Sequence, residues 1–76
     1  MQADQVLDCS GMSCPMPILK TKKAVDSLQT GQILNMISTD PGSIPDVEAW
    51  AKKTGNEVLS SEEKDGKYIF FIKRTK

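Results

Sequence analysis

The sequence has no histidine, no excess of either charge and no long apolar run. Without histidine the chain lacks an imidazole for acid–base catalysis or metal binding, and its two cysteines are too few for a four-cysteine zinc site in one copy. Ten basic residues balance ten acidic ones, so the surplus of positive charge that electrostatic binding to nucleic acid requires is absent. The sequence therefore predicts no metal site, no cofactor and no direct nucleic-acid partner.

Segments that would direct the chain into or across a membrane are also absent from the sequence. The longest apolar run, Tyr68–Ile72, is far shorter than the roughly 20 residues that cross a bilayer. Residues 1–8 contain acidic but no basic side chains, unlike the start of a secretory signal. We expect no membrane contact and a cytoplasmic location, where cysteine thiols stay reduced.

The first half of the chain shows a strand followed by a helix. Residues 6–9 have strand character, with Leu7 and Cys9 on one face. After a loop, Pro15 and Pro17 fit the first turn of a helix, where a missing backbone N–H costs least. Thr30-Gly31 is expected to end this helix. Its apolar face combines residues at helical spacing: Ile18, Thr21, Ala24, Val25 and Leu28.

The second half predicts a strand, a helix and a hairpin. Residues 32–39 are apolar on both faces, which suits a central strand. A helix follows, with Ser43 as its expected N-cap, Asp46 in the place of a capping-box acid and Gly55 after its last turn. Its core stripe is Ile44, Val47, Trp50 and Ala51. A polar strand over 57–63, a turn at Lys64-Asp65-Gly66 and a strongly apolar strand over 67–74 complete the chain.

Together these elements predict one α/β domain over residues 1–76, with the order β-α-β-α-β-β. Two helices would cover one face of a four-stranded mixed sheet, and the other face would be partly open. The apolar residues of the last strand would then be either a patch for a partner or a half-covered second face. Asp40 is expected to cap a turn. Because loops that follow parallel strands gather at one sheet edge, the alternative interpretation is that its loop borders the Cys14 site.

The chemically informative stretch runs from Asp8 to Pro17. It places Cys14 where a loop meets a helix N-terminus, and the local field there stabilises a thiolate or a persulfide. Gly11 lets the loop turn tightly. Because Pro15 and Pro17 have no N–H, we expect the pKa of Cys14 to be lowered only modestly. The arrangement indicates a group that accepts an atom and passes it on.

The pattern D-C-x-G-x-x-C-P-x-P, followed by this order of elements, resembles the TusA/SirA-like sulfur-carrier family over essentially the whole chain, including Thr39–Ser43. The resemblance implies a two-layer sandwich and a persulfide on Cys14. Its donor would be a cysteine desulfurase or a rhodanese, and its acceptor a DsrE-like sulfurtransferase. The end use would be 2-thiouridine formation in tRNA or dissimilatory sulfur oxidation. The positions that match the motif are Asp8, Gly11, Cys14, Pro15 and Pro17, whereas Cys9 is not among the required residues.

Several alternatives stay open at this stage. Cys14 could instead be a sensor thiol of a redox or regulatory module, or the chain could be a binding domain that uses its open sheet face. Cys9 is either a small core residue beside Leu7 or a secondary thiol that forms a disulfide with Cys14. Three lysines on the first helix are either a solvated face or a basic collar that attracts an acidic partner: Lys20, Lys22 and Lys23. Whether such a carrier counts as an enzyme is also open.

Overall fold

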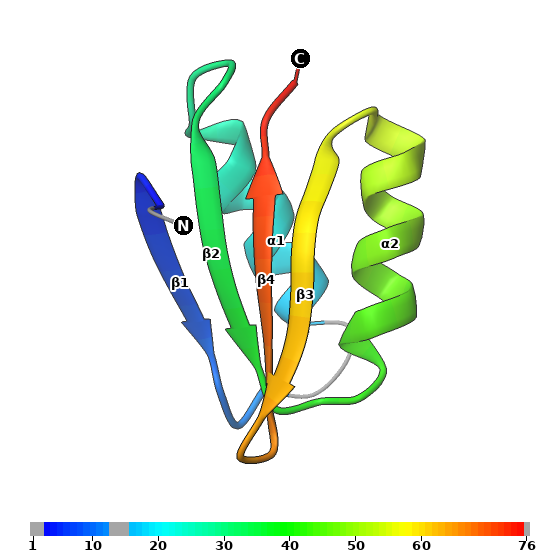
Figure 1. Cartoon of the computed structure of the whole chain (residues 1–76). Coiled ribbons are helices and arrows are strands. Elements are labelled where there is room, and N and C mark those ends of the chain that lie inside the picture. Colours follow the sequence, from blue (N-terminus) through cyan, green and yellow to red (C-terminus); the bar gives the residue numbers. More distant parts are fainter. Residues whose placement is uncertain (1–2, 13–15, 76) are drawn as a thin grey trace.

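The chain folds in the order β-α-β-α-β-β, which confirms the order predicted from the sequence (Figure 1). The computed structural model describes residues 3–12 and 16–75, so Cys14 and Pro15 lie outside the described residues. No helix in this described part is long and apolar enough to cross a membrane. The elements are β1 (Gln5–Cys9), α1 (Met16–Asp26), β2 (Ile33–Ser38), α2 (Ser43–Thr54), β3 (Glu57–Lys64) and β4 (Lys67–Lys73).

The strands form one mixed sheet in the order β1-β2-β4-β3. β1 pairs with β2 in parallel, while β4 pairs antiparallel with both β2 and β3. The last strand of the chain therefore lies inside the sheet, and the strand before it lies at the edge. This arrangement suits the composition of the two strands, because β4 is apolar on both faces and occupies the centre, whereas the polar β3 takes the edge.

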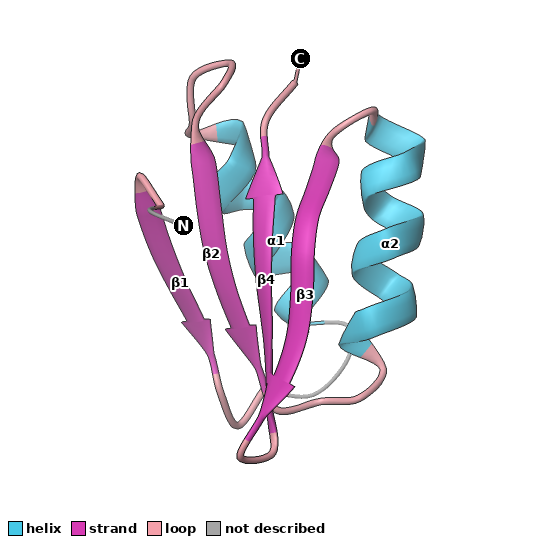
Figure 2. Ribbon diagram, viewed as in Figure 1, coloured by secondary structure: helices cyan, strands magenta, loops and turns pink. Residues whose placement is uncertain are grey.

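Both helices cover the same face of the sheet, giving the two layers seen in Figure 2. Phe70, Leu34 and Met36 are fully buried on this face and pack with Val25 of α1 and Val47 of α2. Along β2 and β4 the alternating residues on the other face are only half-buried. The sheet therefore has one closed face and one partly open face, as the sequence predicted.

The helix ends differ in detail from the sequence-based expectation. α1 ends at Asp26 rather than at Thr30-Gly31, although Leu28 is still buried in the core. The prediction of Ser43 as N-cap is wrong, because Gly42 precedes the first residue of α2 and no side chain caps it. The Ser43 hydroxyl is buried instead in a 2.7 Å hydrogen bond with the Ser38 hydroxyl, so it is not available as a cap. Gly55 ends α2 in the left-handed conformation, as predicted.

Candidate functional site

The motif begins in a tight turn at the carboxyl end of β1. The Asp8 carboxylate accepts a 2.9 Å hydrogen bond from the backbone N–H of Ser10. The backbone N–H of Met12 donates to the carbonyl of Cys9 at 3.1 Å. Gly11 has a φ of 82°, which glycine adopts without the steric strain that a side chain would bring. Asp8 and Gly11 of the motif therefore have clear local roles, since both shape the turn that leads to Cys14.

Asp8 is exposed and has a lowered pKa. The nearby Ser10 hydroxyl is the main cause, followed by the Ser10 backbone N–H, and the positive charge of Lys67 contributes as well. These groups favour the charged form of the carboxyl. Asp8 is therefore an anion at neutral pH, which suits its role as an acceptor in the turn.

The side chain of Thr39, in the loop after β2, accepts a hydrogen bond from this turn. The backbone N–H of Gly11 donates a 2.9 Å hydrogen bond to Oγ1 of Thr39, the residue that follows β2. The loop after Thr39 is itself ordered, because the Asp40 carboxylate accepts from the N–H of Gly42 at 3.0 Å. The loops after the parallel strands β1 and β2 thus meet at one sheet edge (Figure 1).

The start of α1 combines a buried anchor with exposed apolar residues. Pro17 of the motif is buried, and its carbonyl accepts a 2.7 Å hydrogen bond from the hydroxyl of Thr21. Met16 and Leu19 are 43% and 53% exposed. Pro17 therefore fixes the first turn of the helix to the core, while Met16 and Leu19 face solvent close in sequence to Cys14. Cys14 and Pro15, which complete the motif, lie outside the described residues.

Cys9 lies in the core beside the motif. Its side chain is fully buried among core residues that include Met36 and Phe70. Burial raises the pKa of its thiol, and the charge of Asp8 adds to this rise while Lys20 opposes it. This placement favours the interpretation of Cys9 as a small core residue, because a buried neutral thiol is a poor nucleophile.

We expect the Cys9 thiol to be protected from alkylation in the folded protein. In a Cys14→Ser chain, where Cys9 is the remaining thiol, iodoacetamide at pH 8 should react at least about tenfold more slowly than with free cysteine. Addition of urea should remove this protection. The pKa of the Cys9 thiol is raised in the folded protein, so this thiol also makes stability depend on pH. Its stabilising contribution is fully present below the pKa of the thiol in the unfolded chain, and it is lost as pH rises through the pKa in the folded protein. Labelling at the rate of free cysteine would contradict the buried position.

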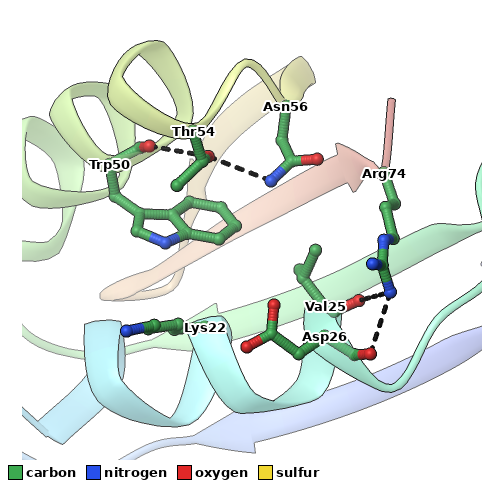
Figure 3. Close-up of a pocket in the computed structure, with 7 residues that line it drawn as sticks. All are labelled: Lys22, Val25, Asp26, Trp50, Thr54, Asn56 and Arg74. Carbon is green, nitrogen blue, oxygen red and sulfur yellow. Dashed lines mark hydrogen bonds between the residues drawn. The ribbon is translucent and has the colours of Figure 1, made fainter. Parts of the chain in front are cut away.

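A hollow of about 140 Å³ lies between α1 and α2, near their carboxyl ends (Figure 3). Thr54 donates to the carbonyl of Trp50 at 2.8 Å, and Asn56 donates to the Thr54 hydroxyl at 3.0 Å. On the other side, Nη1 of Arg74 donates to the carbonyls of Val25, Asp26 and Leu28. Lys22 also lines this hollow, on the side of α1 that faces Trp50. Thr54, Asn56 and Arg74 are engaged in these hydrogen bonds, whereas Nε1 of Trp50 is buried without a partner among the described residues. On the Arg74 side the hollow is a structural junction in which the guanidinium caps α1.

Loss of the Arg74 cap should destabilise the fold. In Arg74→Met the last carbonyls of α1 lose their charged donor, and we expect the free energy of unfolding in urea to fall by about 1.5–3 kcal/mol. Arg74→Lys should recover part of this loss, because it keeps the charge without the planar guanidinium. A matched change of the neighbouring cation, Lys73→Met, should have a smaller effect. Equal losses for positions 73 and 74 would contradict a capping role.

Two features of this sheet edge are missing from the sequence-based prediction. One is the hydrogen bond from Gly11 to Thr39, and the other is the buried pair of Ser38 and Ser43 hydroxyls. The available signal was a set of hydroxyl residues on both sides of Asp40-Pro41-Gly42, because such residues often bond to backbone near turns. The signal does not specify a partner, and in both cases the partner lies on a different element or loop.

Known proteins match this chain over most of its length. The family model described as "Sulfurtransferase TusA" matches residues 5–74. A sulfur carrier protein TusA from Allochromatium vinosum is 51% identical over 72 residues, covering 95% of each chain. A sulfur carrier protein TusA from Pseudomonas entomophila is 34% identical over 71 residues, covering 93% of this chain and 89% of the relative.

The fold also has a counterpart among solved structures. The crystal structure of a SirA-like protein from Desulfitobacterium hafniense superposes with a TM-score of 0.84, covering 95% of this chain and 99% of the other at 24% identity. At that identity the likeness concerns the fold, whereas the family assignment depends on the sequence matches. The motif, the order of elements and these matches agree, and the chain therefore belongs to the TusA sulfurtransferase family of sulfur carriers.

Proposed function

We propose that this protein carries sulfane sulfur as a persulfide on Cys14 and passes it to an acceptor protein in a cytoplasmic sulfur relay. The observation that carries the proposal is the ordered, exposed turn of Asp8 and Gly11, which begins the family motif at an accessible edge of the sheet. Cys14 follows Gly11 by three residues in the sequence. Pro15 and Pro17 complete the motif beside it.

Loading and unloading are two exchanges of the same kind. In loading, the Cys14 thiolate attacks the outer sulfur of a donor persulfide. A sulfur–sulfur bond forms on Cys14, the sulfur–sulfur bond in the donor breaks, and the donor cysteine leaves as a thiolate. In unloading, an acceptor thiolate attacks the outer sulfur on Cys14 in the same way. Neither exchange needs an external oxidant or a cofactor, since the sulfane sulfur keeps its oxidation state.

The surface around the start of α1 supports a protein partner. The exposed side chains of Met16 and Leu19 provide apolar contact area, and Lys20 and Lys23 are exposed on the same helix. Apolar contacts with a basic surround suit a partner whose active-site rim is acidic. We propose a cysteine desulfurase or a rhodanese as donor and a DsrE-like sulfurtransferase as acceptor. Lys22 lies at the hollow beside Trp50, so the collar that we propose consists of Lys20 and Lys23.

The proposed end use is 2-thiouridine formation in tRNA, with the carrier acting upstream of the tRNA itself. The balanced charge of the chain supports this division of labour, because a protein without a positive surplus has little affinity for a polyanion. A relay in dissimilatory sulfur oxidation would use the same exchange on Cys14 with different partners.

Mass spectrometry of the intact chain tests the proposal. Incubation with a cysteine desulfurase and cysteine should add about 32 Da, the mass of one sulfur atom, and a reductant should remove it. The loaded chain should then transfer this sulfur to a DsrE-like protein. If no donor persulfide adds sulfur, and peroxide instead produces a sulfenic acid or a disulfide at Cys14, the thiol is a sensor and the carrier proposal is wrong.

A further inference from the structure

We propose that Thr39 is a positioning residue for Cys14. Its hydroxyl holds the turn that leads from β1 to the reactive cysteine, and it thereby sets the rate at which sulfur is loaded. This inference rests on the proposed function of Cys14 and adds a residue outside the motif. Thr39 contacts neither the sulfur nor the partner in this proposal and acts through the backbone of Gly11.

The Thr39 side chain lies against the turn that follows β1. Side chains alternate along β2, and Ser38 faces the helices, where it is fully buried and bonded to Ser43. The next residue, Thr39, is half-buried and turned to the neighbouring loop, where its Oγ1 accepts from the Gly11 N–H at 2.9 Å. Threonine is branched at Cβ, which restricts the orientations of its hydroxyl. The acceptor therefore lies directly after the last residue of β2 and has few orientations open to it.

The other hydrogen bonds of this turn are local. The N–H of Ser10 bonds to Asp8, and the N–H of Met12 bonds to Cys9, so both of these contacts stay within the turn. Met12 also packs against the hydrophobic core. Among the hydrogen bonds of the described residues, the bond from Gly11 to Thr39 is the one by which residues 10–12 reach another part of the fold. It spans 28 positions in the sequence and joins the two loops that follow the parallel strands.

The hydrogen bond to Thr39 restrains the backbone of Gly11, three residues before Cys14 in the sequence. Gly11 has positive φ and leaves space where a side chain would lie, so its backbone conformation is not restrained by packing of its own. Sulfur exchange requires the attacking thiolate, the sulfane sulfur and the leaving sulfur to lie nearly in line, and small displacements reduce the rate strongly. A restraint on the turn before Cys14 should therefore raise the maximal rate of loading. It should leave docking through Met16 and Leu19 unchanged.

The test compares Thr39→Val, which removes the acceptor at nearly constant shape, with Thr39→Ser, which keeps it. Thr30→Val removes an exposed hydroxyl in the loop between α1 and β2 and serves as the matched control. For each chain the maximal loading rate by a cysteine desulfurase and the half-saturating carrier concentration are measured. Exchange of the Gly11 amide is followed by NMR, and urea unfolding shows that each variant is folded.

For Thr39→Val we expect the maximal rate to fall about two- to tenfold with an unchanged half-saturating concentration, and Gly11 exchange to accelerate by a similar factor. Thr39→Ser and Thr30→Val should stay within about twofold of the parent chain. Parent-like loading and exchange in Thr39→Val would overturn the proposal, and so would equal defects in the valine and serine variants. If no variant accepts sulfur, the proposed function fails, while Gly11 exchange and Cys14 alkylation rates still decide whether Thr39 restrains the turn.

Discussion

Replacing Cys14 by serine should abolish sulfur loading. The chain incubated with a cysteine desulfurase and cysteine should gain no mass, where the parent chain gains about 32 Da, because a serine hydroxyl is not ionised at neutral pH and does not attack a sulfane sulfur at a useful rate. Serine differs from cysteine by one atom, so the variant should keep the fold. Equal urea midpoints for the two chains would establish that the loss is chemical.

Cys9→Ala provides the matched control for this experiment. The chain has two cysteines, and Cys9 is fully buried, so its removal should leave loading intact while costing some stability. A mass gain in Cys14→Ser, or its loss in Cys9→Ala with the fold intact, would contradict the assignment of Cys14 as the carrier residue. A disulfide between the two cysteines in the oxidised parent chain would revive the interpretation of Cys9 as a secondary thiol.

The second large effect concerns the core. Phe70→Ala should lower the free energy of unfolding by about 3–5 kcal/mol, because Phe70 is fully buried at the centre of the core and its truncation leaves a cavity. Small domains have a total stability of only about 5–15 kcal/mol, so this variant should unfold at a much lower urea concentration than the parent chain. Urea titration followed by circular dichroism measures the change.

The neighbouring phenylalanine offers an internal comparison. Phe71 has the same side chain on the same strand, but it faces the open side of the sheet and is only half-buried. Phe71→Ala should therefore cost clearly less than Phe70→Ala, since fewer contacts are lost and solvent fills the space. If the two variants lose equal stability, the open face is as tightly packed as the closed one, and the two-layer description of the core is wrong.

Much of the fold could be predicted because its signals are local. Alternation along the first strand predicts that Leu7 and Cys9 share a face, and helical spacing predicts that Val47 faces the core. The structure confirms both predictions. The prediction of the N-cap of α2 was wrong because the role of this residue depends on a contact with another element. Ser43 has the residue type of a cap, but its hydroxyl bonds to Ser38 on the preceding strand, so a buried contact replaced the local preference.

The candidate site also has one part that the sequence predicts and one part that it does not. The motif could be recognised from residue identities, because Gly11 at a tight turn and Pro17 in a first helical turn follow from backbone chemistry. The role that we propose for Thr39 could not be predicted, since its hydroxyl and the N–H of Gly11 are 28 positions apart. Nothing in either local sequence states that the two loops are within hydrogen-bonding distance.

The sequence by itself therefore determined the types and order of the elements, the apolar faces and the chemical motif, all of which depend on neighbours within a few residues. The tertiary structure decided that β4 lies between β2 and β3, that Cys9 is enclosed in the core, and that Thr39 holds the motif turn. The physical reason is that these features depend on contacts between residues far apart in the chain. These contacts are stabilised by the burial of apolar surface and by hydrogen bonds between polar groups of different elements. Both form only when the sheet and the helices assemble.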